Sequence, residues 1–429
     1  MIADCKIGRN RYIALSKIND KIGKTEKEKK MADIFKKFRD VKNNTLAEAR
    51  EAIRGGYYPF FLPLEKTEGT EVEINGRKLI MLGSNNYLGL STHPEVKKAA
   101  IEAVEKYGTS TTGSRFMNGT LAIHIELEEK LAEFLNREAA LVFSTGYQAN
   151  VGILSSIIGR GDVAITDKED HASIIDGIKM SYGSMLRYKH NDMNDLNRVL
   201  ENAPEDAGKL IVVDGVYSMA GDIARLPEIT EAAKKHGARV MVDDAHGIGV
   251  MGKNGRGTAN YFGMDRGVDI IMGTFSKSFG SLGGFMAADE DTVFYVKHYA
   301  RSFIFSASMS PANAGAALKS LEIMQREPER MEHLWKISDR MRKGLKSLGF
   351  DIGTSNTPII PVYIRDRLKT VMMWKTLFEM GVYCNPVLPP AVQPTESLLR
   401  TSYIATHTEE QIDRALEIFE KAGKRVGVI

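Results

Sequence analysis

The sequence predicts an α/β protein, with a large domain whose mostly parallel sheet is covered by helices and a smaller α+β domain at the C-terminal end. Between residues 139 and 290, short apolar runs alternate with amphipathic segments, a pattern typical of buried parallel strands joined by helices. From about residue 326, a long charged helical pattern leads to further strands. A chain of 429 residues is long enough for one large and one smaller domain.

The secondary-structure elements can be predicted in order. A helix is expected over 93–108, with Pro94 in its first turn and Gly108 at its end. Five apolar runs predict the buried strands of the large domain: 141–145, 162–166, 209–214, 239–244 and 268–273. An amphipathic helix is predicted over 226–238. The small domain is expected to contain a helix over 328–348, strands near 358–364 and 399–404, and a helix over 406–423 capped by Thr406 or Thr408. We therefore expect three segments: a leader over 1–56, a large domain over 57–325 and a small domain over 326–429.

The composition excludes several classes of protein. The two cysteines, Cys5 and Cys384, are far apart and form no CxxC motif, so neither a disulfide framework nor a thiolate metal site is expected. The nine histidines include no HExxH motif, and no apolar run approaches the roughly 18 residues of a membrane span. The first residues lack a signal-peptide core. These features predict a cytoplasmic protein.

The leader carries an excess of positive charge. Residues 1–42 contain 13 Lys/Arg and 6 Asp/Glu, whereas the remainder has a net charge of −4. Two interpretations stay open: a solvated terminal segment, or a docking surface for an anionic membrane or an acidic acyl carrier protein. Nucleic acid is not an expected partner, because no helix-turn-helix, zinc-finger or RNA-binding signature accompanies the charge.

Chemically active side chains follow the predicted strands, where α/β proteins bind ligands. His171 follows the second strand, Asp243 and His246 end the fourth, and Lys277 lies in a loop of small residues after the fifth. Gly146 follows the first strand at the start of a helix, whose backbone N–H groups could bind an anion.

This set contains what pyridoxal 5′-phosphate (PLP) chemistry requires. A lysine amine forms a Schiff base with the cofactor and then moves protons. A carboxylate keeps the pyridine nitrogen protonated, and an imidazole can stack on the ring. Each residue also has a plainer interpretation when taken alone. Lys277 could be a surface lysine and His171 a helix cap, while Asp243 and Asp244 could face water or form half a metal site with His246. The order and spacing of the whole set favour PLP.

One motif suggests a different cofactor. Gly247–Gly252 matches GxGxxG after a strand, and Asp269 follows about 20 residues later. A dinucleotide site needs a helix directly after the motif, but residues 253–263 are glycine-rich and have no apolar period. Dinucleotide binding is therefore not expected.

The chain resembles the α-oxoamine synthases, fold-type-I PLP enzymes that condense an amino acid with an acyl-CoA and release carbon dioxide. The resemblance runs from about residue 57 to 429. Its motifs are NNYLGL (85–90), GSRFMNGT (113–120), STGYQAN (144–150), DHASIIDG (170–177), VDDAHGIG (242–249), GKNGRG (252–257), GTFSKSFG (273–280) and THTEEQIDRAL (406–416).

Local features resemble the members that use L-serine. Ser276 and Ser278 flank Lys277, where siblings usually have Gly or Ser before the lysine and Ala after it, and Tyr217 stands where siblings usually have Phe. This implies condensation of L-serine with palmitoyl-CoA to 3-ketodihydrosphingosine, the first step of sphingolipid synthesis. A sibling activity, glycine C-acetyltransferase or 8-amino-7-oxononanoate synthase, is the alternative. A non-catalytic subunit is not expected, because the lysine is present.

The resemblance also implies residue roles. Lys277 would form the Schiff base, Asp243 would pair with the pyridinium nitrogen, His246 would bond the ring hydroxyl and His171 would stack on the ring. Four residues are implied around the phosphate: Gly146, Tyr147, Thr274 and Ser276. Ser306 and Ala307 would reach the phosphate of the neighbouring subunit, so a homodimer is expected.

The same resemblance implies the substrate contacts. Asn86 would lie near the amino acid, and Arg400 would bind its carboxylate. Some relatives have an Arg before the Pro-Pro pair at 389–390, but this chain has Leu388. We therefore expect Arg400 to carry more of the carboxylate contact.

Overall fold

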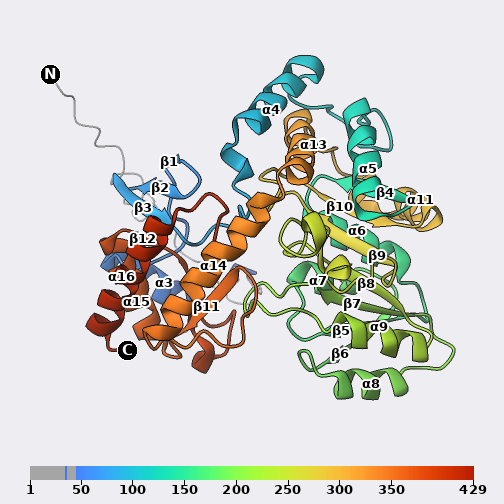
Figure 1. Ribbon diagram of the computed structural model, residues 1–429. Coiled ribbons are helices and arrows are strands. Elements are labelled where there is room, and N and C mark those ends of the chain that lie inside the picture. Colours follow the sequence, from blue (N-terminus) through green and yellow to red (C-terminus); the bar gives the residue numbers. More distant parts are fainter. Residues whose placement is uncertain (1–33, 36–44) are drawn as a thin grey trace, which may run out of the picture. The chain divides into compact units, whose positions relative to one another are not determined.

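The computed structural model describes Ile34–Phe35 and residues 45–429 (Figure 1). The chain divides into two compact units, Met1–Tyr58 and Pro59–Ile429. In the first unit the structure describes helix α3 (Thr45–Gly55), which has Glu48 in its first turn and Arg54 in its last, the polarity that the helix dipole favours. The interpretations of the basic leader fall almost entirely outside the described residues. No helix in the described part of the chain is long and apolar enough to cross a membrane.

The second unit is built on a seven-stranded sheet, which confirms the predicted mostly parallel architecture. Its strand order is β4-β10-β9-β8-β7-β5-β6. The strands are β4 (Ala139–Phe143), β5 (Val163–Asp167), β6 (Ser184–Tyr188), β7 (Lys209–Asp214), β8 (Arg239–Asp243), β9 (Ile270–Thr274) and β10 (Gly284–Ala288). The five neighbouring strands β6, β5, β7, β8 and β9 pair in parallel. Strand β10 pairs antiparallel with both of its neighbours, β9 and β4.

Helices cover both faces of this sheet. Figure 1 shows α8 and α9, which belong to one of the two faces. One face packs against α5 (Ala122–Leu135), α8 (Met193–Glu201), α9 (Leu226–Lys235) and α13 (Pro311–Arg326). The other face packs against α6 (Gly146–Ile157), α7 (Ala172–Lys179), α11 (Glu290–Tyr299) and α12 (Arg301–Ile304). Successive side chains of each strand point to opposite faces of the sheet. Val142 packs in the core on the α5 and α13 side, and Leu141 and Phe143 pack in the core on the α6 and α7 side. This two-sided burial explains why the strands are continuous apolar runs in the sequence.

The C-terminal part forms a smaller α+β layer. Its elements are α14 (Glu329–Ser347), β11 (Ile359–Tyr363), α15 (Arg367–Met380), β12 (Val382–Tyr383), β13 (Asn385–Val387), β14 (Leu398–Ser402) and α16 (Glu409–Val426). Strand β14 pairs antiparallel with both β11 and β13. Thr408, not Thr406, caps α16: its hydroxyl accepts the Gln411 N–H, and the Gln411 side chain accepts the Thr408 N–H.

A second small sheet joins segments that are about 300 residues apart in sequence. Strands β1 (Lys66–Thr67), β2 (Glu71–Ile74) and β3 (Arg77–Met81) form antiparallel pairs, and β12 adds in parallel to β3. Figure 1 shows these four strands in one region of the molecule. Ile80 and Leu82 share a core with the C-terminal helices. The domain boundary at residue 325 stays a prediction, but residues 66–82 share a sheet and a core with the C-terminal layer.

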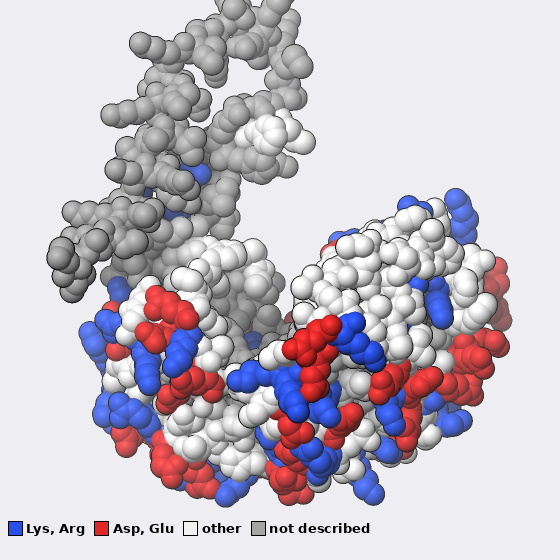
Figure 2. All heavy atoms as spheres, turned by 90° about the horizontal axis from the view of Figure 1, so that it is seen from above, with Lys and Arg blue, Asp and Glu red and all other residues white. Residues whose placement is uncertain are grey.

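The remaining described elements are short or connect the layers. They are α4 (Pro94–Tyr107), α10 (Thr258–Tyr261), η3 (Leu90–Thr92), η4 (Lys253–Gly255) and η5 (Pro394–Glu396). Helix α4 has Pro94 at its first position and Gly108 at its end, as the sequence predicts. Figure 2 shows Lys and Arg interspersed with Asp and Glu over the displayed face. The described surface seen there therefore has no extended patch of only positive or only negative charge.

Candidate active site

A cavity of about 280 Å³ opens at the carboxyl ends of the central strands. Its lining joins the ends of β4, β7, β8 and β9 to the starts of α6 and α7. The lining residues are Thr145, Gly146, Tyr147, Asn150, His171, Ser173, Asp214, Asp243, Ala245, His246, Met272, Thr274, Ser276, Lys277 and Leu282. The structure therefore brings together these predicted residues: Gly146, Tyr147, His171, Asp243, His246, Thr274, Ser276 and Lys277.

Lys277 follows β9 in the 275–283 loop, and its side chain lines this cavity. Burial lowers the pKa of its amine to about 8, because a charged ammonium is poorly solvated there. Asp243 and Asp214 act in the opposite direction, and Arg400 lowers the pKa further. About a tenth of Lys277 is consequently a neutral amine at pH 7, the form that reacts with a carbonyl group, whereas an unshifted lysine would be almost entirely charged.

Asp243 is a buried carboxylate held by two donors. Its Oδ2 accepts a 2.7 Å hydrogen bond from Asn150 Nδ2, and its Oδ1 accepts a 3.1 Å bond from the Ala245 N–H. Asn150 lies on α6, so a helix fixes the carboxylate that β8 presents. These contacts orient the Asp243 carboxylate at the edge of the cavity.

The adjacent Asp244 has a different environment. Its two oxygens accept 2.6 Å bonds from the backbone N–H and the hydroxyl of Thr258. Burial raises the pKa of Asp244 to about 6, although the bonds from Thr258 oppose the shift. Asp244 is not among the residues that line the cavity. Of the two consecutive aspartates, only Asp243 is available to a ligand there.

His171 serves both as a helix cap and as a wall of the cavity. Its Nδ1 accepts the Ser173 N–H at 3.3 Å and lies 2.7 Å from the Ser173 hydroxyl, so Nδ1 is an acceptor and Nε2 carries the proton. Ser173 Oγ in turn accepts a 2.8 Å bond from Asn150. Burial and the charge of Lys277 lower the pKa of His171, while Asp243 raises it. The two predictions for His171, cap and site residue, are compatible.

His246 lines the same cavity and contacts Tyr87. The Tyr87 hydroxyl is 2.7 Å from His246 Nδ1, and both side chains are buried. Burial lowers the pKa of His246 well below its usual range, and the charges of Lys277 and Arg400 lower it further. His246 is consequently neutral near pH 7.

The start of α6 forms a cradle suited to an anion. Thr145 caps the helix by accepting the Gln148 N–H at 3.1 Å, and Gly146 and Tyr147 occupy its first turn. A Cβ at Gly146 would lie 2.8 Å from Thr274 Oγ1, so only glycine fits between the helix and β9. Thr274 Oγ1 lies 2.9 Å from Ser276 Oγ, which adds a second hydroxyl at the cavity wall. First-turn amides and adjacent hydroxyls are typical ligands of a phosphate.

The other residues implied around the phosphate lie at the rim. Tyr147 is half-exposed, and its hydroxyl donates to Asp176 at 2.5 Å. Ser306 Oγ accepts a bond from Gln148, and the Ala307 carbonyl accepts a bond from Ser144. Ser306 and Ala307 are therefore bonded beside the cradle without lining the cavity.

Arg400 lies on β14 and is fixed by two acceptors. Its Nε donates to the Ser218 carbonyl at 2.5 Å, and its Nη2 donates to Asn85 Oδ1 at 3.0 Å. Arg400 also lies close enough to lower the pKa values of Lys277 and His246 by its charge. Asn86, by contrast, is bonded to Ser91 through both its amide nitrogen and its amide oxygen. Asn85, the preceding residue, is the one that contacts the arginine.

Leu388 lies beyond the end of β13 and is half-buried. Its side chain has no hydrogen-bond donor, so a second carboxylate contact from this position is excluded by its chemistry.

Several residues of the cavity were not predicted. Asn150, Ser173 and Asp214 line it, and Asp214 Oδ1 has no hydrogen-bond partner among the described residues. Burial and the charges of Asp243 and Asp170 raise the pKa of Asp214 well above its usual range. Asp214 ends a predicted strand just as Asp243 does, so the same signal could have identified it. Asn150 and Ser173 lie inside helical patterns and give no comparable signal.

These observations test whether the residues fit PLP, and they fit. An amine with a lowered pKa, a buried carboxylate, a neutral imidazole and an anion cradle converge on one cavity, and a buried carboxylate oxygen there lacks a partner. The GxGxxG motif does not form a dinucleotide site. After Gly252 the chain enters the three-residue turn η4 and then the four-residue helix α10, which is too short to present a helix N-terminus.

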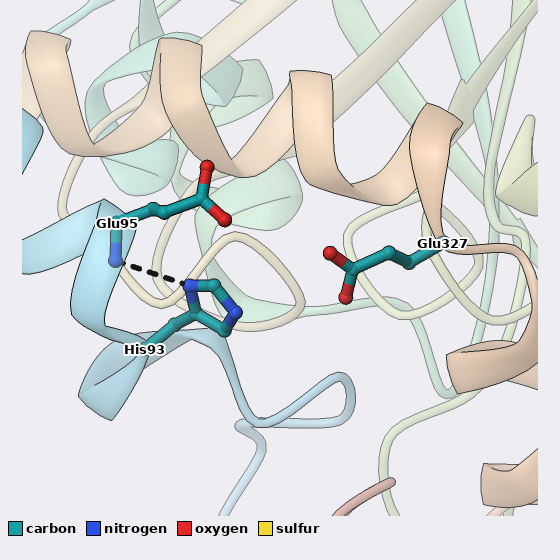
Figure 3. Close-up of side chains that lie close together, drawn as sticks. All are labelled: His93, Glu95 and Glu327. Carbon is teal, nitrogen blue, oxygen red and sulfur yellow. Dashed lines mark hydrogen bonds between the residues drawn. The ribbon is translucent and has the colours of Figure 1, made fainter.

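One group of possible metal ligands lies elsewhere among the described residues: His93, Glu95 and Glu327 (Figure 3). Arg326 contacts both Glu95 oxygens, at 2.6 and 3.0 Å, and also bonds Glu327. His93 Nδ1 accepts the Glu95 N–H as a helix cap. These carboxylates are thus neutralised by arginine, and the group carries no argument for a metal.

Comparisons with known proteins agree with this geometry. A profile described as aminotransferase class I and II matches residues 77–419. A serine palmitoyltransferase of Sphingobacterium spiritivorum is 50% identical over 373 residues, which cover 87% of this chain and 94% of that protein. An 8-amino-7-oxononanoate synthase of Symbiobacterium thermophilum is 45% identical over 377 residues, which cover 88% and 96%. Among solved structures, a serine palmitoyltransferase from S. paucimobilis with a bound PLP–myriocin aldimine has a TM-score of 0.89 at 40% identity, covering 93% of this chain and 100% of that chain.

Proposed function

Because the chain belongs to the class I and II aminotransferase family, in the branch of the α-oxoamine synthases, we propose that it acts as a serine palmitoyltransferase. The reaction joins L-serine to a long-chain acyl-CoA, palmitoyl-CoA, and releases CoA and carbon dioxide. The product is 3-ketodihydrosphingosine, which opens sphingolipid synthesis. PLP is the cofactor.

The observation that carries this proposal is the set formed by Lys277, Asp243 and Arg400 in a chain 50% identical to a serine palmitoyltransferase over nearly all of that protein. The identity to an 8-amino-7-oxononanoate synthase is lower, 45%. Ser278 directly after the lysine, where siblings usually have Ala, and Tyr217, where they usually have Phe, also favour the serine enzyme over its siblings.

The proposed roles follow from the environment of each residue. Bound PLP supplies a carbonyl that links to an amine and a protonated ring that stabilises negative charge on the neighbouring carbon. Asp243, held by Asn150, would keep a proton on the ring nitrogen, and His171 would contact the ring face. His246 would donate its Nε2–H to the ring hydroxyl. The α6 cradle, with Thr274 and Ser276, would hold the phosphate.

The substrate roles belong to Arg400 and Lys277. Arg400 would bind the serine carboxylate with parallel N–H donors, which fixes which bond to the α-carbon stands perpendicular to the ring. Lys277 Nζ would accept the α-proton, since its pKa of about 8 makes the neutral amine available. A carbon–carbon bond then forms to the thioester carbonyl, the thiolate leaves, the carboxylate departs as carbon dioxide, and a proton returns to the α-carbon.

A titration tests the amino-acid choice. The holoenzyme is titrated with L-serine, glycine and L-alanine while the absorbance of the cofactor is recorded, and products are analysed with acyl-CoAs of graded length. We expect L-serine to bind best and a long acyl chain to be preferred. A response to glycine or alanine alone, with a short acyl-CoA, would establish a sibling activity instead.

A homodimer is proposed as the working form. Large apolar side chains are exposed on α11 and directly after α12, in the segment that leads to Ser306: Phe294, Tyr295, Tyr299 and Phe305, the last 74% exposed. Exposed apolar surface of this kind is typical of protein interfaces. The adjacent Ser306 and Ala307 would then reach the phosphate in the partner. Sedimentation should show a dimer, and an active monomer that retains PLP would contradict it.

The leader supports a finer proposal about partners and location. Its net charge of +7 over residues 1–42 suits an anionic membrane surface or an acyl carrier protein as acyl donor. The enzyme would then work in the cytoplasm, at the inner face of the membrane. A solvated segment without a partner is the alternative that a deletion distinguishes.

A further inference from the structure

His190 lies between two carboxylates in the turn that follows β6. Its Nδ1 is 2.9 Å from Asp167 Oδ1, and its Nε2 is 2.8 Å from Asp222 Oδ2. A carboxylate only accepts hydrogen bonds, so both ring nitrogens donate and the ring is an imidazolium. Burial alone would lower the pKa of His190, but the bonds and charges of Asp167 and Asp222 raise it to about 10.

Asp222 belongs to the 215–225 loop, which follows β7. The loop is closed by a bridge between Val216 and Ile223 and by a 3.0 Å bond from the Tyr217 N–H to the Asp222 carbonyl. The Tyr217 ring packs edge-on to His190, with ring centroids 4.5 Å apart. Beside His190, the Asn191 side chain also donates to Asp222 Oδ2, at 2.9 Å, and to the Ile223 carbonyl, at 3.2 Å. The turn after β6 therefore holds the 215–225 loop in place through the side chains of His190 and Asn191.

The other side of the 215–225 loop contacts the C-terminal layer. The Gly221 carbonyl accepts a 2.8 Å bond from the buried Thr357 hydroxyl. A Cβ at Gly221 would lie 2.2 Å from the Ile359 carbonyl oxygen, so the backbone of the loop lies directly against the start of β11. In the same loop, the Ser218 carbonyl accepts the 2.5 Å bond from Arg400 Nε.

We propose that His190 is a positioning residue for the amino-acid carboxylate. Its imidazolium ties Asp167, at the end of β5, to Asp222 and so fixes the 215–225 loop. The loop in turn presents the Ser218 carbonyl that holds the Arg400 guanidinium. His190 thus acts on the substrate through Arg400 without lining the cavity. The inference rests on the proposed role of Arg400 in binding serine.

The test compares two kinds of amine on the holoenzyme. L-Serine carries the carboxylate that Arg400 would bind, whereas ethanolamine has the same amine and hydroxyl without it. The variants are His190→Gln, which removes the cation, and Asp222→Asn, which keeps the His190–Asp167 contact. Arg198→Gln is the matched control, since it breaks an exposed ion pair with Asp195 on the nearby α8.

In His190→Gln, the dissociation constant for L-serine, measured from the cofactor absorbance, should rise about tenfold, the effect of weakening one charged hydrogen bond between Arg400 and the serine carboxylate. The constant for ethanolamine should stay within about twofold, and Arg198→Gln should match the wild type. In a double variant with Arg400→Lys, the loss in serine affinity should be less than the product of the two single losses, because both act through one contact.

Hydrogen exchange gives a readout that is independent of function. Amides of residues 215–225 should exchange faster in His190→Gln and in Asp222→Asn than in the wild type, while those of β9 should not change. Equal weakening of both amines, or unchanged exchange in 215–225, would overturn the proposal. If His190→Gln does not fold, Asp222→Asn decides by the same measurements. A wild-type protein with no preference for L-serine over ethanolamine would count against the proposed role of Arg400, and the exchange data would still decide whether His190 holds the loop.

Discussion

The hydroxyl of Tyr87 lies 2.7 Å from Nδ1 of His246, whereas its distance to Asn85 Oδ1 is 3.4 Å. Burial raises the pKa of Tyr87 to about 12, so the phenol keeps its proton, and His246 is neutral. Because the contact with His246 is the shorter one, the Tyr87 hydroxyl donates its proton to Nδ1. Nδ1 is then an acceptor, and the imidazole proton of His246 lies on Nε2. Tyr87 thereby sets which atom of His246 can donate to a ligand.

Replacing Tyr87 by Phe should remove the hydrogen bond that keeps the imidazole proton of His246 on Nε2. Nδ1 would lose its partner in a buried site, so the protein should retain PLP about tenfold less tightly. Nitrogen NMR of the imidazole should show the Nε2–H form in the wild type and a mixture in Tyr87→Phe. A wild-type Nδ1–H form would contradict the assignment.

Asp243 and Asp244 form a matched pair of substitutions. Asp243→Asn should slow deuterium exchange at the serine α-carbon by about a hundredfold, because an amide cannot hold the proton on the ring nitrogen. Asp244→Asn should leave the exchange nearly unchanged and lower the melting temperature by a few degrees, since its two bonds to Thr258 support only the fold. Wild-type exchange in Asp243→Asn would show that another carboxylate serves the ring.

The rate at which the cofactor-free protein captures PLP should reveal the pKa of Lys277. Only the neutral amine reacts, so with a pKa of about 8 the rate should rise about tenfold from pH 7 to pH 9 and then level. An unshifted lysine would give a rise of about a hundredfold over the same range. Borohydride trapping of the Lys277–PLP linkage at graded pH measures the rate of capture. Asp214→Asn should move the midpoint to lower pH, because that carboxylate raises the pKa of Lys277.

Deletion of residues 1–42 tests the leader. If this segment docks an anionic membrane or an acidic carrier, its loss should leave kinetics with soluble acyl-CoA nearly unchanged and weaken binding to anionic liposomes or acyl carrier protein. Each basic group near an anionic membrane contributes on the order of 1 kcal/mol. Wild-type binding should also fall with salt, as the Debye length shortens to about 8 Å. Salt-independent association would remove the electrostatic mechanism, and loss of folding would show that the leader supports the protein body.

Strands β4, β5, β7, β8 and β9 could be predicted because each is an apolar run buried on both faces. The site residues could be predicted because they lie where those runs end. Strand β6 was missed because it lies at the edge of the sheet and is only partly buried. Strand β10 is also an apolar run buried along its whole length and could have been predicted, but its antiparallel pairing with β4 and β9 leaves no local signal. The pairing of β3 with β12 joins residues about 300 positions apart and leaves no local signal.

Side-chain direction was the second limit on prediction. Asn85 and Asn86 are adjacent and chemically identical, and only the turn that bonds Asn86 to Ser91 decides that Asn85 meets Arg400. The bonds that Asn150 makes to Ser173 and Asp243 likewise depend on how α6 packs against α7. A single sequence carries no record of these contacts.

The most direct test of the proposed function follows the carbon atoms of the reaction. The holoenzyme is incubated with palmitoyl-CoA and L-serine labelled with ¹³C at the carboxyl carbon, and the products are identified by mass spectrometry, with Lys277→Ala as the control. We expect unlabelled 3-ketodihydrosphingosine and labelled carbon dioxide from the wild type, and neither from the variant. A labelled product, or full activity in Lys277→Ala, would contradict it.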